Sequence, residues 1–230
     1  MTSQQSIQLQ AQNAKGAARL LVSMSAAAKS KILLAMADAV EKNTSAILSA
    51  NQLDVEAAKK NGVSSSFIDR LTLSDKSIQA MARSVREIAA QPDPLGEVLE
   101  SLKRPNGIQI DKVRVPLGVI GIIYESRPNV TVDASVLCLK AGNAVILRGG
   151  KDAFRSNQIL AKLLQEAGRA AGLPDGAVQL LESVDRASIT ELTQFPQYVD
   201  LIIARGSEEM INDVMKNSLV PVLGHGKGVC

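Results

Sequence analysis

The apolar positions of the first ninety residues recur at helical spacing. The segments 7–23, 26–40, 47–61 and 74–90 each place apolar residues three and four apart, which predicts amphipathic helices. The predicted apolar faces include Ile7, Leu9, Leu33, Leu53 and Ile78. None of these segments carries recognisable chemistry, so we expect residues 1–91 to form a helical layer that packs on the rest of the chain.

The period changes from helical to alternating after the linker Gln91-Pro92-Asp93-Pro94. Apolar residues alternate with polar ones over 98–103 and 108–115, on either side of Pro105-Asn106-Gly107. Asn-Gly is a strong turn signal, so the pattern predicts a β-hairpin. Because an isolated hairpin is marginally stable, we expect residues 92–116 to form an arm that supports oligomer formation; an arm that covers its own domain is an equal alternative.

Strands and helices alternate in the remainder of the chain. Short apolar runs predict buried strands at 117–124, 144–147, 178–181, 199–204 and 219–223. A helix is predicted between each pair, the first over 132–141 with Leu137 on its apolar side. Strands joined by helices are parallel with right-handed crossovers, so the fold class is α/β with a doubly wound parallel sheet.

Three loops with distinctive chemistry follow predicted strands, and ligands bind at the carboxyl ends of such strands. The loops are Glu125-Ser126-Arg127-Pro128-Asn129, Arg148-Gly149-Gly150-Lys151 and Arg205-Gly206-Ser207. In the second loop, glycines permit close backbone approach, a helix start offers N–H groups and the basic residues add charge, which together suit phosphate. An ordinary strand-to-helix turn also needs glycine, so that alternative stays open; the convergence of all three loops favours a nucleotide site.

Composition narrows the function classes. The net charge is only +3, and five aromatic residues with no Trp offer little for bases to stack on, which argues against nucleic-acid binding. The polar start indicates neither export nor a membrane anchor, and Cys138 and Cys230 show no sign of a disulfide, so a reducing cytoplasm is the simplest location. His225 stands alone among glycines, and no cluster of ligand residues predicts a metal site.

Four blocks of the chain closely resemble the aldehyde dehydrogenase superfamily, and within it the branch of gamma-glutamyl phosphate reductases. The blocks are 115–121, 124–131, 142–151 and 200–206. The similarity extends over essentially the whole chain, including Asn51 and Asp54 in the helical part. The resemblance implies a Rossmann-like dinucleotide-binding domain over 117–230, a separate catalytic domain and a β-arm for homo-oligomer formation.

The resemblance also implies an activity. The branch uses NADPH to reduce L-glutamyl 5-phosphate to L-glutamate 5-semialdehyde with release of phosphate, a step of proline biosynthesis, and it is functionally linked to glutamate 5-kinase. A cysteine thiolate attacks the acyl phosphate and hydride reduces the thioester, so the pKa of that cysteine must be lowered by its surroundings.

Several residues take roles by this resemblance. The implied cofactor contacts are Glu125, Arg127, Pro128, Arg148, Gly149, Gly150, Lys151, Arg205, Gly206 and Ser207. Arg148 with Lys151 would favour a 2′-phosphate and hence NADP. Asn129 and Ser126 are the two candidates for the oxyanion donor that the wider superfamily supplies from an Asn.

The chain departs from the family's pattern where it stops. The nucleophilic cysteine of the family lies a few tens of residues beyond the glycine-rich turn, whereas Cys230 aligns with a strand of the cofactor half. Cys138 lies in an apolar helix and is expected to be a small core residue. No catalytic residue is therefore expected within the chain, whose catalytic domain is expected to be missing; a catalytically silent relative that binds a dinucleotide or a partner subunit is the alternative.

Overall fold

The computed structural model describes residues 3–125 and 127–224. The first part is helical, with α1 (Ser3–Leu21), α2 (Ala26–Lys42), α3 (Thr44–Lys60), α4 (Ser65–Leu71) and α5 (Asp75–Ala90). Serine side chains cap the starts of α2 and α5. The Ser25 hydroxyl accepts a hydrogen bond from the backbone N–H of Ala28, and Ser74 forms a reciprocal capping box with Ser77. The helical prediction for this part is confirmed.

A five-stranded parallel sheet forms the centre of the molecule. Its strands are β3 (Val119–Ile123), β4 (Ala144–Arg148), β5 (Val178–Leu180), β6 (Leu201–Ala204) and β7 (Val222–Gly224). The spatial order is β5-β4-β3-β6-β7, so the chain reverses its direction of winding between β3 and β6. The doubly wound parallel sheet expected from the sequence is confirmed, and its switch point lies between these two strands.

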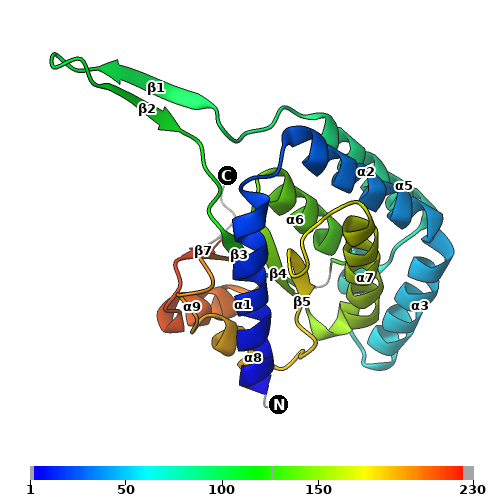
Figure 1. Cartoon of the computed structure of the whole chain (residues 1–230). Coiled ribbons are helices and arrows are strands. Elements are labelled where there is room, and N and C mark those ends of the chain that lie inside the picture. The colour runs from blue at the N-terminus through cyan, green and yellow to red at the C-terminus, as the bar shows by residue number, and fades with distance from the viewer. Residues whose placement is uncertain (1–2, 126, 225–230) are drawn as a thin grey trace.

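Helices cover both faces of this sheet (Figure 1). The connecting helices are α6 (Asn129–Lys140), α7 (Phe154–Ala170, after a 3-10 turn over Lys151–Ala153), α8 (Arg186–Leu192) and α9 (Glu208–Asn217). α6 and α7 pack on one face, and α2, α3 and α5 form a further layer over them. α1 packs instead with α8 on the opposite face, so the expected N-terminal layer is divided between the two sides.

An ion pair fixes α1 at the start of the central strands. Lys15 Nζ lies 2.7 Å from both carboxylate oxygens of Asp200, and Asp200 Oδ2 also accepts from the backbone N–H of Val119 at 2.8 Å. Gly118 has a φ of +124°, and a Cβ there would lie 2.2 Å from Asp200 Oδ2. Only glycine allows this approach, so the contact joins α1, β3 and β6.

Three leucines expected on buried helix faces are exposed instead. Leu9, Leu53 and Leu137 have exposed fractions of 43%, 53% and 54%. In α3, two of the four buried positions are held by the polar residues Asn51 and Asp54, which have partners across the interface. In α6, apolar residues occur on nearly every side, so the spacing alone does not reveal which side faces the sheet.

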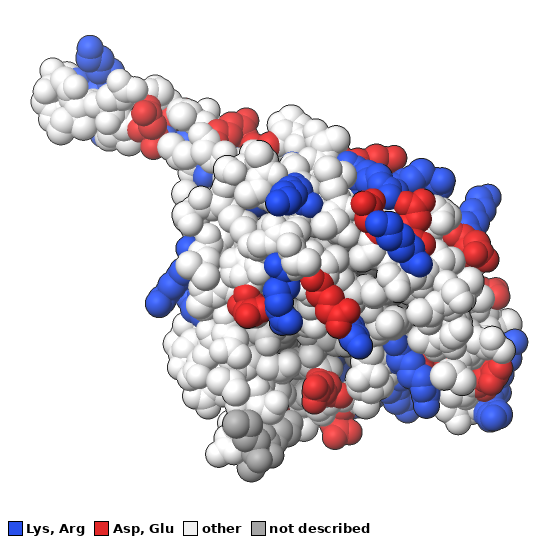
Figure 2. All heavy atoms as spheres, turned by 45° about the vertical axis from the view of Figure 1, so that its right-hand side comes forward, with Lys and Arg blue, Asp and Glu red and all other residues white. Residues whose placement is uncertain are grey.

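The predicted hairpin is present and stands clear of the body. β1 (Val98–Lys103) pairs antiparallel with β2 (Gln109–Val113), and the turn closes with a bond from Gly107 N–H to the Arg104 carbonyl, with Gly107 at a φ of +88°. Every residue of both strands is exposed, and Figure 2 shows the hairpin projecting from the body as a narrow finger. The alternative that the arm covers its own domain is therefore wrong.

Candidate dinucleotide-binding site

Two adjoining hollows lie at the carboxyl ends of the central strands. The first, of about 340 Å³, is lined by residues that include Glu125, Arg127, Arg205, Gly206 and Ser207. The second, of about 390 Å³, is lined by residues that include Glu125, Arg148, Arg186, Ser207 and Asp213. Tyr124, Glu125 and Ser207 line both hollows, so the loops that follow β3 and β6 form the ridge between them. The structure thus brings loops that are about 80 residues apart in sequence to the switch point.

The loop after β6 is held close to the loop after β3. The N–H of Arg205 donates to the Ile123 carbonyl at 2.8 Å, which extends the strand pairing by one residue. Ser207 caps α9, because its side chain accepts from the Met210 N–H at 3.3 Å. A Cβ on Gly206 would lie 2.3 Å from the Met210 Cε atom and 3.0 Å from the Glu125 carboxyl carbon. Glycine at 206 therefore permits Glu125 to pack against the start of α9.

A buried polar chain lies beneath the ridge. The Tyr124 hydroxyl lies 2.7 Å from Thr131 Oγ1, and Thr131 Oγ1 donates to Asn157 Oδ1 at 3.0 Å. Burial raises the pKa of Tyr124, and the hydrogen bond with Thr131 opposes this only in part, so the phenol stays neutral. A Cβ on Gly149 would lie 2.2 Å from Asn157 Nδ2. The absence of a Cβ at Gly149 thus leaves room for the Asn157 side chain, and the expectation that Gly149 admits a bound group stays a prediction.

The guanidinium of Arg148 donates hydrogen bonds to three backbone carbonyls. Its NH2 group donates to the carbonyls of Val184 at 2.6 Å and Asp185 at 3.0 Å, and its NH1 group donates to the Gly149 carbonyl at 3.3 Å. Only 7% of Arg148 is exposed. Burial lowers its pKa, and the charge of Asp185 opposes that shift. Arg148 therefore holds the β5–α8 loop as a wall of the second hollow, and its expected contact with a 2′-phosphate stays a prediction.

The start of α7 is likewise occupied by the protein itself. Asp54 of α3 accepts from the Ser156 N–H at 2.8 Å, from the Ser156 hydroxyl at 2.7 Å and from the Arg155 N–H at 3.3 Å. The carboxylate fills the place where an anion would bind a helix start. The prediction of unpaired N–H groups is wrong for these two residues. Lys151 is exposed and lines neither hollow, so its expected cofactor contact stays a prediction.

The other residues singled out in the sequence lie at the start of α6, in its buried part or outside the described residues. Asn129 donates through Nδ2 to Asp133 Oδ2 at 2.9 Å, and Pro128 is buried at the start of α6. Burial raises the pKa of Asp133, while the bond from Asn129 acts against that shift. Burial also raises the pKa of the Cys138 thiol to about 12, so the prediction that it is a core residue is confirmed. Ser126, His225 and Cys230 lie outside the described residues.

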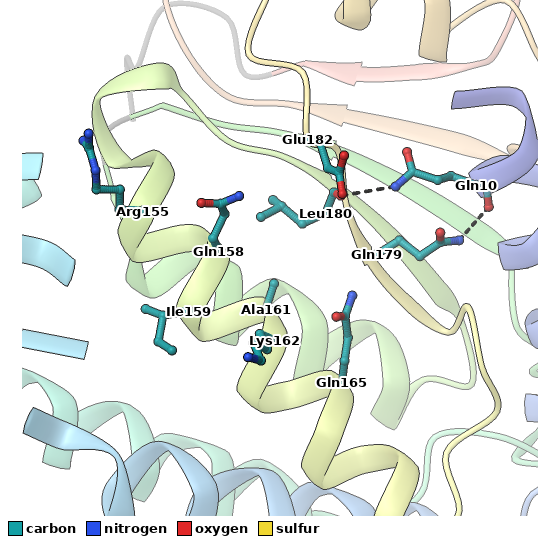
Figure 3. A pocket seen from close by; sticks show the side chains of 10 residues that line it. All are labelled: Gln10, Arg155, Gln158, Ile159, Ala161, Lys162, Gln165, Gln179, Leu180 and Glu182. Atoms are coloured by element: carbon teal, nitrogen blue, oxygen red, sulfur yellow. Dashed lines mark hydrogen bonds between the residues drawn. The ribbon is translucent and has the colours of Figure 1, made fainter. Parts of the chain in front are cut away.

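A further hollow, of about 580 Å³, lies away from these loops between α1, α7 and β5 (Figure 3). Three glutamine side chains there bond to backbone carbonyls. Gln165 Nε2 donates to Val178 at 3.0 Å, Gln10 Nε2 donates to Leu180 at 3.3 Å and Gln179 Nε2 donates to Gln10 at 2.6 Å. Val178 and Leu180 belong to β5, the edge strand of the sheet. The side-chain amides of Gln10 and Gln165 therefore satisfy two carbonyl groups on the edge that no other strand covers. We do not assign this hollow as the ligand site.

Sequence reasoning missed two arginines that line the site. Arg70 of α4 lies in the first hollow and Arg186 of α8 lies in the second. Neither residue belongs to a glycine-rich loop or follows a strand directly, so no local motif marks them. Within residues 3–125 and 127–224, no helix is long and apolar enough to cross a membrane, and no group of three or more His, Cys, Asp or Glu residues has a metal-binding arrangement.

The parallel sheet and its switch point, with the paired hollows beside it, define a doubly wound α/β protein. The model of the aldehyde dehydrogenase family matches residues 1–222, and the chain belongs to that family. More narrowly, it is similar to gamma-glutamyl phosphate reductases. The enzyme of Moorella thermoacetica is 52% identical over 224 residues, which are 97% of this chain and 54% of that protein. The enzyme of Geotalea daltonii is 49% identical over 230 residues, or 100% of this chain and 55% of that protein.

Solved structures agree with this similarity. The gamma-glutamyl phosphate reductase of Thermotoga maritima superposes with a TM-score of 0.92 at 39% identity, covering 94% of this chain and 52% of that one. An acetylating aldehyde dehydrogenase of Geobacillus thermoglucosidasius shares the fold, with a TM-score of 0.74 at 21% identity. The match covers 98% of this chain and 47% of that one. The chain spans about half the length of the curated relatives it matches.

Proposed function

We propose that this chain forms the cofactor-binding part of an enzyme that reduces L-glutamyl 5-phosphate to L-glutamate 5-semialdehyde and phosphate with NADPH, in proline biosynthesis. The observation that supports this most is the pair of hollows at the switch point, in a chain about half identical to gamma-glutamyl phosphate reductases over nearly its whole length. This similarity favours the reductase over a catalytically silent dinucleotide-binding relative.

The residues around the hollows fit a dinucleotide phosphate. The hollows share Tyr124 and Ser207 and so lie next to each other. An extended dinucleotide needs two such neighbouring hollows, one for each half. In this proposal Arg148 shapes the wall of the second hollow, and the exposed Arg186 beside it supplies the positive charge for a 2′-phosphate. When bound, the reduced nicotinamide supplies the hydride.

The loops on the other side of the ridge would orient the reacting end of the cofactor. Glu125 and Arg127 extend from β3, and Arg205 and Gly206 extend from β6, so each is positioned by a strand of the sheet. Cys138 is excluded as the nucleophile because its thiol is buried and stays protonated. We assign the thiolate of the proposed reaction to no described residue.

The arm is proposed to hold a homo-oligomer together. Its two strands pair only with each other, and the hairpin exposes six apolar side chains on these strands and the turn between them: Val98, Leu99, Leu102, Ile108, Ile110 and Val113. A narrow hairpin that exposes so many apolar residues is suited to pairing with another subunit. We further propose a cytoplasmic location and a functional link to glutamate 5-kinase, which would supply the acyl phosphate.

A direct assay tests the proposed reaction in the protein isolated from its natural source. L-glutamate 5-semialdehyde, phosphate and NADP⁺ are combined with the protein, and formation of NADPH is followed by absorbance. We expect NADPH to form only when phosphate is present, because the acyl phosphate must be regenerated. NADPH formation without phosphate would indicate an ordinary aldehyde oxidation instead, and no NADPH under any condition would refute the reductase.

A further inference from the structure

Three arginines from three separate elements line the first hollow. Arg70 belongs to α4, Arg127 to the loop after β3 and Arg205 to the loop after β6. All three are exposed, and Glu125 is the one acidic side chain among the lining residues that the structure describes. The hollow therefore carries an excess of positive charge beside the switch point. Arg70 comes from the N-terminal helical part, where the sequence showed no chemistry.

The side chain of Arg70 is held in place within α4. Its Nε atom donates to the Ser66 carbonyl at 3.1 Å, and its guanidinium carbon lies 6.0 Å from the centre of the Phe67 ring. Phe67 also lines the hollow. This combination of a hydrogen bond and a cation–π contact restricts the guanidinium and leaves its two terminal nitrogens to face a ligand.

The helix that carries Arg70 is itself anchored to the body. The buried Asn51 of α3 donates through Nδ2 to the Leu71 carbonyl at 2.8 Å and accepts through Oδ1 from the Leu73 N–H at 2.7 Å. Asn51 Nδ2 also donates to the Ser156 hydroxyl at 3.0 Å, at the start of α7. α4 therefore keeps a fixed position relative to the sheet, and Arg70 stays at the edge of the hollow.

We propose that Arg70, Arg127 and Arg205 form a binding site for a phosphate group. Guanidinium groups bind phosphate through paired, charge-assisted hydrogen bonds, and three of them around a hollow of about 340 Å³ match a doubly charged anion. The proposal rests on the proposed function, in which two ligands carry phosphate next to this hollow. One is the acyl phosphate substrate, and the other is the diphosphate of the dinucleotide.

Titration of the protein with inorganic phosphate tests the site without any assay of activity. Binding is measured by calorimetry for the unchanged protein, for Arg70→Met and for Arg83→Met. Arg83 is an exposed arginine on α5 outside the hollow, so its substitution is the matched control. We expect Arg70→Met to weaken phosphate binding at least tenfold, and Arg83→Met to leave it within twofold.

A repeat of the titration with saturating NADPH distinguishes the two sources of phosphate. Binding that persists with NADPH assigns the hollow to the phosphoryl group of the substrate, and competitive loss assigns it to the diphosphate of the cofactor. The site is refuted if phosphate does not bind, or if Arg70→Met and the control bind it equally. A protein that binds phosphate through Arg70 but neither binds nor oxidises NADPH would instead refute the proposed function alone.

Discussion

Arg148 and Arg186 line the same hollow but differ in what their guanidinium groups contact. Arg148 is bonded to carbonyls of the β5–α8 loop, whereas Arg186 is exposed. We predict that Arg186→Ala weakens NADPH binding about tenfold or more and changes NADH binding less than twofold, since one charge-assisted contact to the 2′-phosphate is lost. Dissociation constants from fluorescence titration check this.

Two matched variants complete this prediction. Lys151→Ala should leave both cofactors unaffected, because Lys151 lines neither hollow. Arg148→Met should weaken the binding of NADPH and NADH to the same extent, because the β5–α8 loop that forms the wall of the hollow loses its hydrogen bonds to Arg148. Equal losses of NADPH and NADH binding in Arg186→Ala would contradict the assignment, as would a selective loss of NADPH binding in Lys151→Ala.

The buried amine of Lys29 makes stability depend on pH through Asp93. Lys29 is 2% exposed and lies 2.7 Å from the Asp93 carboxylate. Burial alone would raise the pKa of Asp93, but the hydrogen bonds from Lys29 and from the Leu95 N–H outweigh it, so the pKa is lowered. The ionised carboxylate therefore stabilises the fold above the ordinary Asp pKa, and that contribution is lost as the pH falls below it.

Substitution of Asp93 tests this dependence. At pH 7, Asp93→Asn leaves a buried cation without its counter-charge and should lower the free energy of unfolding by roughly 2–4 kcal/mol. Below about pH 4 the carboxylate is protonated in the unfolded chain before it is protonated in the folded protein, whose Asp93 pKa is lowered, so the difference between the two proteins should shrink as the pH falls further. Urea unfolding over a series of pH values measures it. A difference that stays constant down to pH 3 would show that Asp93 does not act through its charge.

At the scale of single elements, the edge strand β5 depends on side chains of its neighbours. Gln10 and Gln165 satisfy the carbonyls of Leu180 and Val178 on its free edge. We predict that the double variant Gln10→Ala with Gln165→Ala associates with increasing concentration, because unpaired strand edges recruit other strands. Light scattering compares it with Gln52→Ala, an exposed glutamine on α3. Identical masses for both variants at every concentration would argue against edge protection.

Elements differed in how far the sequence predicted them. Repeated spacing is a strong signal, so most of the helices, the hairpin and the five strands followed from it, whereas the short helix α4 did not. The buried faces of three helices, α1, α3 and α6, did not follow in full. Asp54 is buried because Ser156, about 100 residues later, donates two hydrogen bonds to it, and no local pattern contains that partner. Leu137 lies on α6, which is apolar on nearly every side. The spacing of its apolar residues therefore did not indicate which side of the helix faces the sheet.

The site was predictable only in outline for a similar reason. The loops after β3 and β6 were located because a parallel sheet brings the carboxyl ends of its strands together. The hydrogen bonds of Arg148 could not be predicted because only the fold brings its partners, the carbonyls of Val184 and Asp185, close to it. Arg70 was missed because the fold, and not the sequence, brings α4 to the hollow.

At the scale of the whole molecule, the arm offers a test of assembly. Leu102 and Ile110 are paired across its strands and about half exposed. We predict that Leu102→Asp with Ile110→Asp dissociates the proposed oligomer and changes the free energy of unfolding of the body by less than about 1 kcal/mol, since neither residue packs on it. Sedimentation gives the mass, with Lys112→Ala as the control. An unchanged mass in the double variant would show that the arm does not form the subunit interface.

The central claim is that the carboxyl edge of this sheet binds a dinucleotide phosphate. Calorimetric titration of the chain with NADPH and, separately, with NADH measures this most directly. The account predicts one site per chain, with NADPH bound at least tenfold more tightly than NADH because a guanidinium meets the 2′-phosphate. Equal affinity for the two cofactors, or no binding of either, would contradict it.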